Sequence, residues 1–274
     1  MGSYVRPQSL DEAVDLLAAG QHRILAGGTD LYPVAGADLA GEVLDVTDIP
    51  SLRGIVQDGD LRIGACATWS EIAAAPLPPA LRALQQAARH VGGRQIQNAG
   101  TIGGNLCNAS PAADGVPPLL IVDAIVELAS LEGLRRMALS AFLSGPRQTA
   151  RRADEVLTAI IVPKAAFSGQ SSFEKLGARA YLVISIAMVA ARIVMRDGRI
   201  ETAAIAVGAC SGVARRLPLV EAALTGLDKA SVPTALRAQD MAAALSSIDD
   251  IRATACYRDT AATELVARAI AGVL

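Results

Sequence analysis

One stretch near the N-terminus organises the chain: Ile24-Leu25-Ala26-Gly27-Gly28-Thr29-Asp30-Leu31. Here an apolar run stops at two glycines and resumes at a polar residue. A glycine pair allows positive φ and places no side chain in the way. A series of bare backbone N–H groups can then point to one side and form an anion-binding concavity. The sequence therefore predicts a phosphate-binding turn at this position.

A second glycine pair resembles the first and lies in Gly100-Thr101-Ile102-Gly103-Gly104-Asn105. In both segments a polar residue follows the glycines and can add a side-chain hydrogen bond. Neither segment fits the P-loop GxxxxGK[ST] or the G-x-G-x-x-G turn of a Rossmann unit. Taken alone, each pair is more often a simple turn than a phosphate site. Taken together, the two loops are predicted to hold one diphosphate, through backbone amides and without Arg or Lys, which indicates a dinucleotide between two lobes.

Composition excludes several classes of protein. The 274 residues are 52% hydrophobic and 19% charged, which is enough apolar material for a substantial core. Aromatic residues make up only 3% and the formal net charge is −2, so the chain lacks the stacking platforms and basic surface that nucleic acids require. The longest apolar stretch, Leu182 to Ala191, is too short to span a bilayer. We expect a cytoplasmic protein without a transmembrane segment or a nucleic-acid partner.

Reactive side chains are sparse. The four cysteines (Cys66, Cys107, Cys210 and Cys256) form neither a metal-binding pattern nor a disulfide framework, so each is expected to be a small buried hydrophobe and no metal site is predicted. His22 and His90 are expected on or at the ends of surface helices. No nucleophile or acid–base motif is present. We therefore predict no catalytic residue, and any redox chemistry would belong to a cofactor.

The first two parts of the chain read as small lobes of mixed structure. Residues 1–57 combine a helix after a Ser9 capping box with two short strands, and residues 58–165 form a second lobe that contains the second glycine loop. The predicted strands are Arg23–Ala26, Glu42–Val46, Leu61–Ala65, Ile125–Ala129 and Val156–Val162, and a helix is predicted at Pro79–His90.

The third part has a different pattern. A linker is predicted at Lys164–Ser172, and the domain itself at residues 170–274. Two β-branched runs meet at Asp197-Gly198, a strong hairpin signal. Helices are predicted after them, at Leu219–Leu224, Pro233–Leu245 and Tyr257–Val273. Antiparallel strands followed by helices indicate a separate α+β domain.

Two charged residues have alternative interpretations. Asp114 could bind a ribose hydroxyl or an adenine amine, or it could form an Asx turn or helix cap before Pro117. Lys175 could face a flavin or a phosphate, or it could be an ordinary solvated lysine. The residues alone favour the structural alternative for both.

Several ordered motifs resemble the FAD-binding subunits of the molybdenum hydroxylases, the family of xanthine dehydrogenase and aerobic carbon monoxide dehydrogenase. The resemblance covers nearly the whole chain. Its segments are Ala26–Leu31, Leu61–Ala65 with Thr68, Thr101–Asn105, Ala109–Asp114, Phe142, Thr149, Asp154–Leu157, Ile161–Pro163, Phe173, Lys175, Arg179, Gly208, Glu221–Leu224 and Tyr257-Arg258.

This resemblance implies an α+β fold: a two-lobed FAD-binding domain of the vanillyl-alcohol oxidase/PCMH type plus a C-terminal domain with an antiparallel sheet and helices. FAD would lie between the lobes, with its isoalloxazine near the C-terminal domain. The implied flavin-binding residues are Ile24, Leu25, Ala26, Gly27, Gly28, Thr29, Asp30, Leu31, Thr101, Ile102, Gly103, Gly104, Asn105, Asp114, Leu157 and Lys175.

The resemblance also implies a role in a larger assembly. The chain would be the medium subunit of an oxidoreductase, with a large molybdopterin-binding subunit and a small subunit carrying [2Fe-2S] clusters, and a dimer of such heterotrimers is expected. Electrons would reach FAD and leave to NAD, oxygen or another acceptor. Two positions depart from the family pattern. Val183 stands where members commonly have Asp, and Val91 stands where eukaryotic relatives have an aromatic residue.

Two other functions stay open from the sequence. A stand-alone flavin oxidase of the related fold would need a substrate base, and often a His or Cys for covalent attachment of the flavin. Cys107, just past the second glycine loop, is the candidate for that attachment. A non-catalytic nucleotide-binding module would bind no flavin.

Overall fold

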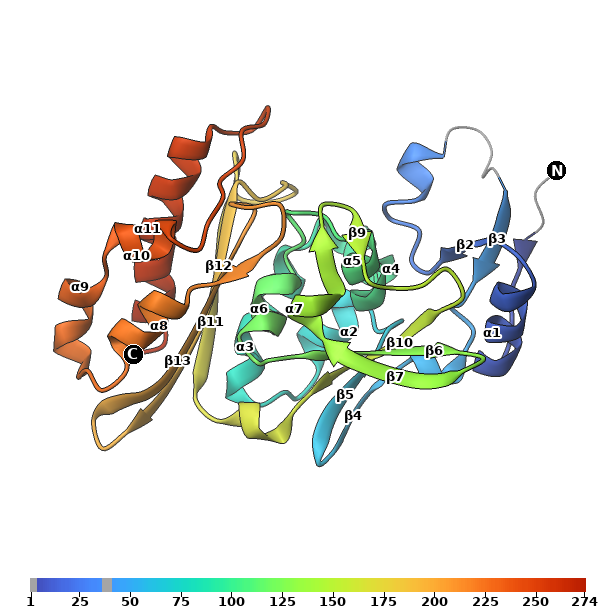
Figure 1. The fold of residues 1–274 in the computed structure, drawn as a ribbon, viewed down its shortest axis with the longest axis horizontal. Coiled ribbons are helices and arrows are strands. Elements are labelled where there is room, and N and C mark those ends of the chain that lie inside the picture. Colours follow the sequence, from blue (N-terminus) through green and yellow to red (C-terminus); the bar gives the residue numbers. More distant parts are fainter. Residues whose placement is uncertain (1–3, 36–40) are drawn as a thin grey trace.

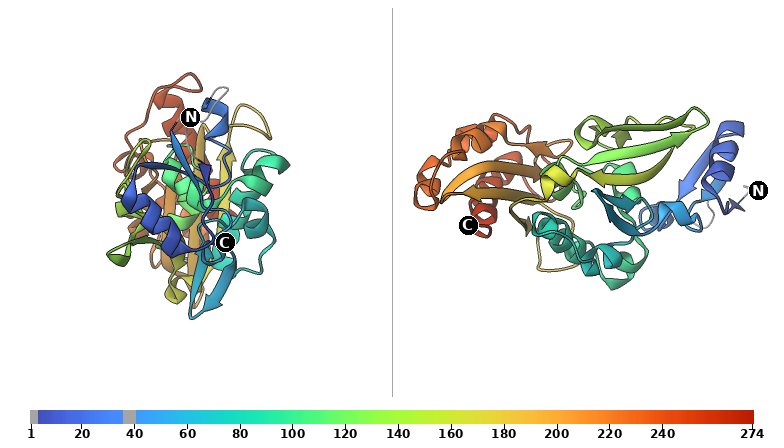
Figure 2. Two further views of the ribbon diagram at one scale, coloured as in Figure 1. Left: turned by 90° about the vertical axis from the view of Figure 1, so that its right-hand side faces the viewer. Right: turned by 90° about the horizontal axis from the view of Figure 1, so that it is seen from below.

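The structure is a computed structural model that describes residues 4–35 and 41–274. Three bodies follow one another along the long axis: a C-terminal domain, a central lobe 2 and an N-terminal lobe 1 (Figure 1). The view from below shows the same order, with the two chain termini at opposite ends (Figure 2). Part of the predicted range of lobe 1, residues 1–3 and 36–40, lies outside the described residues.

Lobe 1 packs one helix on a small parallel sheet. Helix α1 (Leu10–Ala19) begins at Ser9, whose side chain accepts a hydrogen bond from the Glu12 N–H, as the capping motif predicts. The strand order is β1 (Tyr4–Val5), β3 (Glu42–Asp45), β2 (His22–Leu25). Short helices η1 (Tyr32–Val34) and η2 (Pro50–Leu52) follow β2 and β3. Only Leu25 of β2 is buried, because β2 borders the cavity described below.

Lobe 2 is built on a five-stranded antiparallel sheet. Its order is β4 (Ile55–Asp58), β5 (Asp60–Gly64), β10 (Val156–Val162), β6 (Ile125–Ser130), β7 (Gly133–Ala138). The predicted boundary between residues 57 and 58 cuts the β4–β5 hairpin, in which Asp58 pairs with Asp60. The boundary is therefore misplaced by a few residues, because β4 hydrogen-bonds into the sheet of lobe 2 and not into that of lobe 1.

Short helices cover this sheet. They are α2 (Trp69–Ala74), η3 (Pro79–Leu81), α3 (Arg82–His90), α4 (Arg94–Ala99), α5 (Ile102–Asn108), α6 (Val116–Leu120) and α7 (Leu139–Phe142), followed by the hairpin β8 (Leu143–Gly145) and β9 (Gln148–Thr149). The second glycine pair was predicted to be a loop, but Gly103 and Gly104 lie in the first turn of α5. Thr101 caps that turn through its side chain, which accepts from the Gly104 N–H.

The C-terminal domain is a four-stranded antiparallel sheet with helices on its outer face. The strands are β11 (Gln170–Leu176), β12 (Ala187–Arg196), β13 (Arg199–Gly208) and β14 (Arg215–Arg216). The helices are α8 (Pro218–Leu224), η5 (Lys229–Ser231), α9 (Val232–Ala235), α10 (Ala238–Ala242) and α11 (Ala255–Ala271). The other face of the sheet packs on α3 and α6 of lobe 2, which joins the two bodies (Figure 1).

Two predictions for this region need correction. The irregular segment is shorter than the predicted linker of residues 164–172. Helix η4 (Lys164–Phe167) occupies the start of that range, and β11 begins at Gln170, before its end. The predicted helix 233–245 is two short helices, because Arg237 has extended backbone angles. The hairpin at Asp197-Gly198 is confirmed, and both residues have positive φ, as a tight two-residue turn requires.

Candidate functional site

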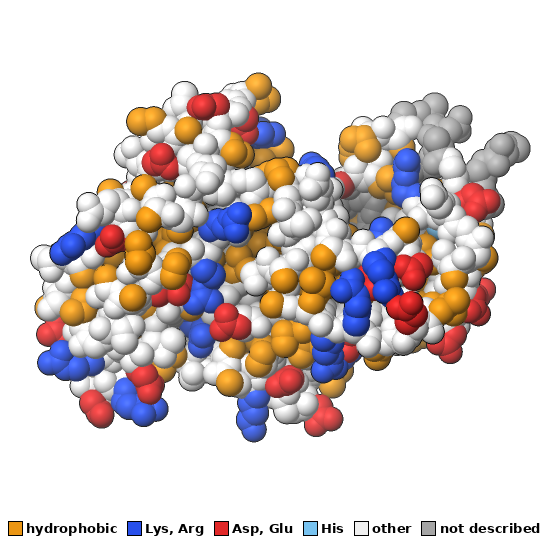
Figure 3. Space-filling view, in the orientation of Figure 1, with side chains coloured by type: hydrophobic (Ala, Val, Ile, Leu, Met, Phe, Trp, Pro, Cys, Tyr) orange, Lys and Arg blue, Asp and Glu red, His pale blue; other side chains and the backbone are white. Residues whose placement is uncertain are grey.

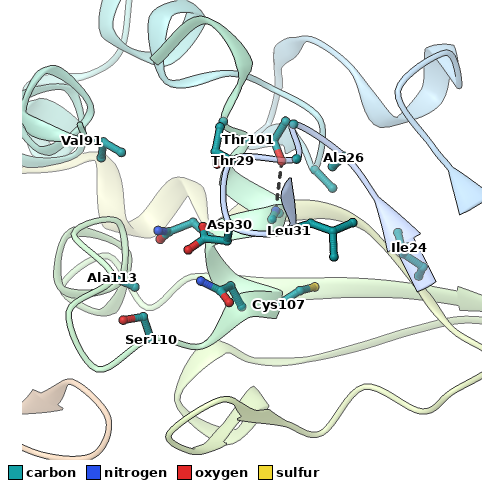
Figure 4. A pocket seen from close by; sticks show the side chains of 18 of the residues that line it. Ile24, Ala26, Thr29, Asp30, Leu31, Val91, Thr101, Cys107, Ser110 and Ala113 are labelled. Atoms are coloured by element: carbon teal, nitrogen blue, oxygen red, sulfur yellow. Dashed lines mark hydrogen bonds between the residues drawn. The ribbon is translucent and has the colours of Figure 1, made fainter. Parts of the chain in front are cut away.

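A cavity of about 1180 Å³ separates lobe 1 from lobe 2, and the C-terminal domain borders one end of it. Lobe 1 contributes the first glycine loop, and lobe 2 contributes the start of α5 and the segment that follows α5. Figure 4 shows Thr29 beside Thr101, with Asp30 between these two residues and the side chains of Cys107 and Ser110 in this view. Drug-sized ligands occupy pockets of roughly 300–1,000 Å³, so the cavity has room for an extended dinucleotide.

Most of the predicted flavin-binding residues meet here. All of them line the cavity except Ile102 and Lys175. Ile102 belongs to the core of lobe 2 and has no exposed surface, so its predicted contact with the ligand is not supported by the structure.

The backbone N–H groups of the first glycine loop are free. Within the described residues, no group accepts a hydrogen bond from the N–H of any residue from 26 to 31. The chain turns at Gly28, which has a φ of +70° and whose carbonyl accepts from the Tyr32 N–H at 2.9 Å. Buried or half-buried N–H groups are nearly always paired in proteins. This run of free donors beside a cavity is therefore suited to an anion.

Gly27 has a second reason to lack a side chain. A Cβ built there would lie 1.8 Å from the carbonyl oxygen of Ala99 and 2.9 Å from the Cα of Gly100. The backbone of lobe 1 touches the backbone of lobe 2 at this point. Gly27 therefore permits the contact between the lobes that closes one side of the cavity.

The second glycine pair works differently from the first. The N–H of Ile102 donates to Ala67 O at 3.0 Å, that of Gly103 to Ala65 O at 2.8 Å, and that of Gly104 to the Thr101 hydroxyl at 3.0 Å. These are the N–H groups that a helix start leaves unpaired, and here the protein itself satisfies them. These three N–H groups therefore have acceptors within the protein, unlike those of the first loop, and their contact with a diphosphate stays a prediction.

The second glycine pair leaves room for a ligand in the cavity, because its residues have no side chains. A Cβ at Gly104 would meet only the Thr101 hydroxyl oxygen, at 2.9 Å, and otherwise would project toward the cavity that Gly104 lines. Beside it, the Oδ1 atom of Asn105 is buried and has no hydrogen-bond partner among the described residues. An unpaired buried polar atom is costly, so this amide is a candidate ligand contact.

Asp114 and Lys175 form a buried ion pair. Lys175 Nζ lies 2.5 Å from Asp114 Oδ2 and also donates to His90 O at 3.1 Å. Asp114 lines the cavity and is 7% exposed, whereas Lys175 lies behind it, outside the cavity wall. Burial raises the pKa of the Asp114 carboxyl, while Lys175 and the Ser185 hydroxyl act in the opposite direction. Lys175 is thus no solvated surface lysine.

Sequence reasoning missed the cationic side chains of the cavity. Arg23, Arg147 and Arg151 all line it. Arg147 has a φ of +60°, and its N–H donates to Ala109 O at 2.8 Å, which holds the β8–β9 turn against the end of α5. Nothing in the sequence around them marks these arginines as part of a cavity wall. The expectation of a diphosphate site without Arg overlooked them.

Part of the cavity lining is apolar. It comprises Val91, Ile96, Leu182, Val183 and Ile184, the last three next to the C-terminal domain. Cys107 also lines the cavity, and burial raises the pKa of its thiol to about 11. The lining thus combines free backbone donors and arginine side chains with aliphatic surface.

The remaining cysteines and histidines lie as follows. Cys66 and Cys210 are buried, as expected, but Cys107 is only partly buried and Cys256 is exposed on α11, so the expectation of four buried thiols is wrong for these two. His22 lines the cavity with its Nε2 3.3 Å from Glu42, whereas the His90 side chain does not line it. Residues 4–35 and 41–274 contain no group of three or more metal-ligating side chains, and none of their helices is long and apolar enough to cross a membrane.

Two lobes around a donor-lined cavity, with a third domain at one end, define a dinucleotide-binding flavoprotein subunit. Residues 1–165 match the model of the FAD binding domain in molybdopterin dehydrogenase, and residues 171–273 match the CO dehydrogenase flavoprotein C-terminal domain. The chain belongs to this family of FAD-carrying medium subunits of molybdenum hydroxylases. The family, the fold class and FAD as cofactor are therefore confirmed.

Relatives match over almost the full length. The chain is 32% identical over 273 residues to the nicotine 6-hydroxylase medium subunit of Paenarthrobacter nicotinovorans, covering 97% of this chain and 95% of the relative. It is 32% identical to the carbon monoxide dehydrogenase medium chain of Afipia carboxidovorans, covering 97% and 94%. The structure of carbon monoxide dehydrogenase from Hydrogenophaga pseudoflava superposes with a TM-score of 0.91 at 29% identity, covering 99% and 96%.

These matches define the biochemical setting. The chain is the FAD subunit of an oxidoreductase of the molybdenum hydroxylase family, in which its relatives are medium subunits.

Proposed function

We propose that this chain holds FAD in the inter-lobe cavity and passes electrons from the [2Fe-2S] clusters of the small subunit to a final acceptor. Bound there, FAD would accept electrons one at a time and release them in pairs. The chain's own residues bind and orient the cofactor and shield it from solvent. The observation that carries the proposal is the run of free N–H groups at residues 26–31, facing a cavity that Gly104 leaves open.

The two kinds of cavity lining suit the two parts of FAD. The free amides of the first loop and the nearby guanidinium groups of Arg23, Arg147 and Arg151 favour the diphosphate. The apolar surface of Val91 and residues 182–184 favours the isoalloxazine. Asn105 and Asp114 have polar atoms along the wall for the remaining hydrogen bonds.

Gly104→Val tests this assignment. The added side chain would enter the cavity, so we expect the complex purified with this variant to contain little or no FAD while its secondary structure is retained. The measurement is the FAD-to-protein ratio from absorbance after the flavin is released.

Two controls isolate the effect of bulk in the cavity. Gly20→Val adds the same side chain at an extended position where a Cβ makes only ordinary contacts of 3.7 Å. Thr101→Val removes the helix cap without filling the cavity. Normal flavin content in Gly104→Val would overturn the proposed site.

A stand-alone oxidase with covalently bound flavin is the alternative. Cys107 is the cysteine nearest the second glycine pair, but its pKa of about 11 leaves it as a neutral thiol near pH 7. We expect acid precipitation to release all flavin into the supernatant. Flavin retained in the protein pellet of the wild type, and lost from the pellet in Cys107→Ser, would establish the covalent alternative instead.

We further propose a dimer of heterotrimers in the cytoplasm. Exposed apolar side chains on the C-terminal domain, including Tyr181, Ile251 and Tyr257, offer surface for other subunits. The four free cysteines suit a reducing compartment. The mass of the purified complex in solution, measured by light scattering, distinguishes one heterotrimer from two.

A further inference from the structure

A buried hydrogen-bond network joins three separate segments at the cavity wall. Asp114 comes from lobe 2, Lys175 from β11, and Ser185 from the segment between β11 and β12. The Asp114 carboxylate uses both oxygens, because Oδ1 accepts from the Ser185 hydroxyl at 2.5 Å and Oδ2 accepts from Lys175 Nζ at 2.5 Å. Asp114 is the member of this network that lines the cavity.

Ser185 is placed to act on Asp114. It is 1% exposed, and the next residue anchors the segment through a hydrogen bond from the Ile186 N–H to Leu176 O at 2.8 Å. The residues just before it, 182–184, belong to the apolar part of the cavity lining. Hydrogen bonds to a buried carboxylate are strong and directional. Without the Ser185 hydroxyl, one oxygen of Asp114 would be left unpaired.

We propose that Ser185 is a positioning residue for Asp114. Its hydroxyl fixes the orientation of the Asp114 carboxylate and neutralises part of its charge, and thereby sets the affinity and the reduction potential of FAD in this subunit. The inference rests on the proposed location of FAD. Reduced FAD has more negative charge than oxidised FAD. A carboxylate that is less neutralised therefore disfavours the reduced form and lowers the potential.

Ser185→Ala in the complete complex is the test. We expect an increase in the FAD dissociation constant, because the Asp114 carboxylate is no longer held in one orientation at the cavity wall, together with a lower flavin reduction potential. The matched control is Ser172→Ala. Ser172 is also buried in the C-terminal domain, but its hydroxyl donates to Ala269 O at 2.6 Å, away from the cavity. We expect the control to keep the wild-type affinity and potential.

A double-mutant cycle with Asp114→Asn shows whether Ser185 acts through Asp114. Removing the carboxylate should raise the potential, and Ser185→Ala should then have no further effect on it. Circular dichroism of each variant confirms that the complex is folded.

The inference would be overturned if Ser185→Ala matched Ser172→Ala in both affinity and potential. It would also be overturned if the full effect of Ser185→Ala persisted in the Asp114→Asn background, since the hydroxyl would then act elsewhere. A wild-type complex without FAD would instead contradict the proposed function.

Discussion

Asp250 pairs with the most deeply buried arginine of the C-terminal domain. Arg258 is 1% exposed, and its Nη2 donates to Asp250 Oδ1 at 2.6 Å while Nη1 donates to backbone carbonyls. Partial burial acts to raise the pKa of Asp250, but hydrogen bonds from the Arg252 backbone and the Arg258 guanidinium lower it to about 2. The ion pair therefore connects α11 to the preceding segment, and its strength depends on pH because the Asp250 carboxyl must be ionised.

This pair predicts a pH-dependent contribution to stability. Because the folded pKa is below the ordinary value of 3.8, the contribution is complete above about pH 4 and is lost as the pH falls toward 2. We expect Asp250→Asn to lower the free energy of unfolding by about 1.5 kcal/mol at pH 6. Urea titrations at pH 6 and pH 3 should show the difference between the two proteins narrowing at the lower pH. A difference that stays constant would rule out a role for the ionised carboxylate.

The sequence located the cavity residues better than it assigned their roles. Gly27, Gly28 and Gly104, which were predicted to contact the flavin, line the cavity. The glycine pairs could be recognised in the sequence because a side chain at these positions would clash with a neighbouring residue or occupy the space of the ligand. The role of the second pair could not be predicted, since the acceptors of its N–H groups are the carbonyls of Ala65 and Ala67. Such a contact depends on tertiary structure. Arg23, Arg147 and Arg151 were missed because arginine has no pattern specific to a cavity wall.

At the scale of elements, α3 of lobe 2 is capped by the C-terminal domain. The Ala83 N–H in its first turn donates at 2.9 Å to the hydroxyl of Ser171, which lies on β11 and donates in turn to Pro79 O at 3.2 Å. Residue Leu81 at the N-cap offers no side-chain hydrogen bond of its own. The cap therefore also fastens lobe 2 to the C-terminal domain.

Ser171→Ala is expected to destabilise the chain by about 1 kcal/mol, the usual contribution of a helix cap. Urea denaturation measures the change, and hydrogen exchange should localise faster opening to the start of α3. An unchanged midpoint, with unaltered exchange there, would show that the contact between domains contributes nothing.

Element existence was easier to predict than element boundaries. Strands β5, β6 and β10 follow from their apolar patterns, but β7 was not predicted, because Gly133–Ala138 is largely exposed and has two adjacent arginines in place of an apolar run. It forms a strand because it pairs with β6 at the edge of the sheet. The assignment of β4 to lobe 2 likewise depends on pairing partners, which local sequence does not specify.

At the scale of the whole molecule, charges of both signs are mixed on the face that Figure 3 draws, where basic and acidic side chains are interleaved over the central lobe. Within this lobe, Arg135 and Arg136 pair with the buried carboxylates of Glu155 and Glu127. Lobe 1 meets lobe 2 around the cavity, so a ligand that contacts both walls would hold them together. The family resemblance, and not the residue pattern alone, supplied FAD as the cofactor.

Hydrogen exchange at the two glycine pairs tests the central claim most directly. In the chain freed of FAD, the amides of residues 26–31 should exchange rapidly because they have no acceptor, while those of residues 102–104 should exchange slowly because the protein itself satisfies them. Reloading FAD should strongly protect residues 26–31 and change residues 102–104 little. Equal exchange at residues 26–31 with and without FAD would contradict the account.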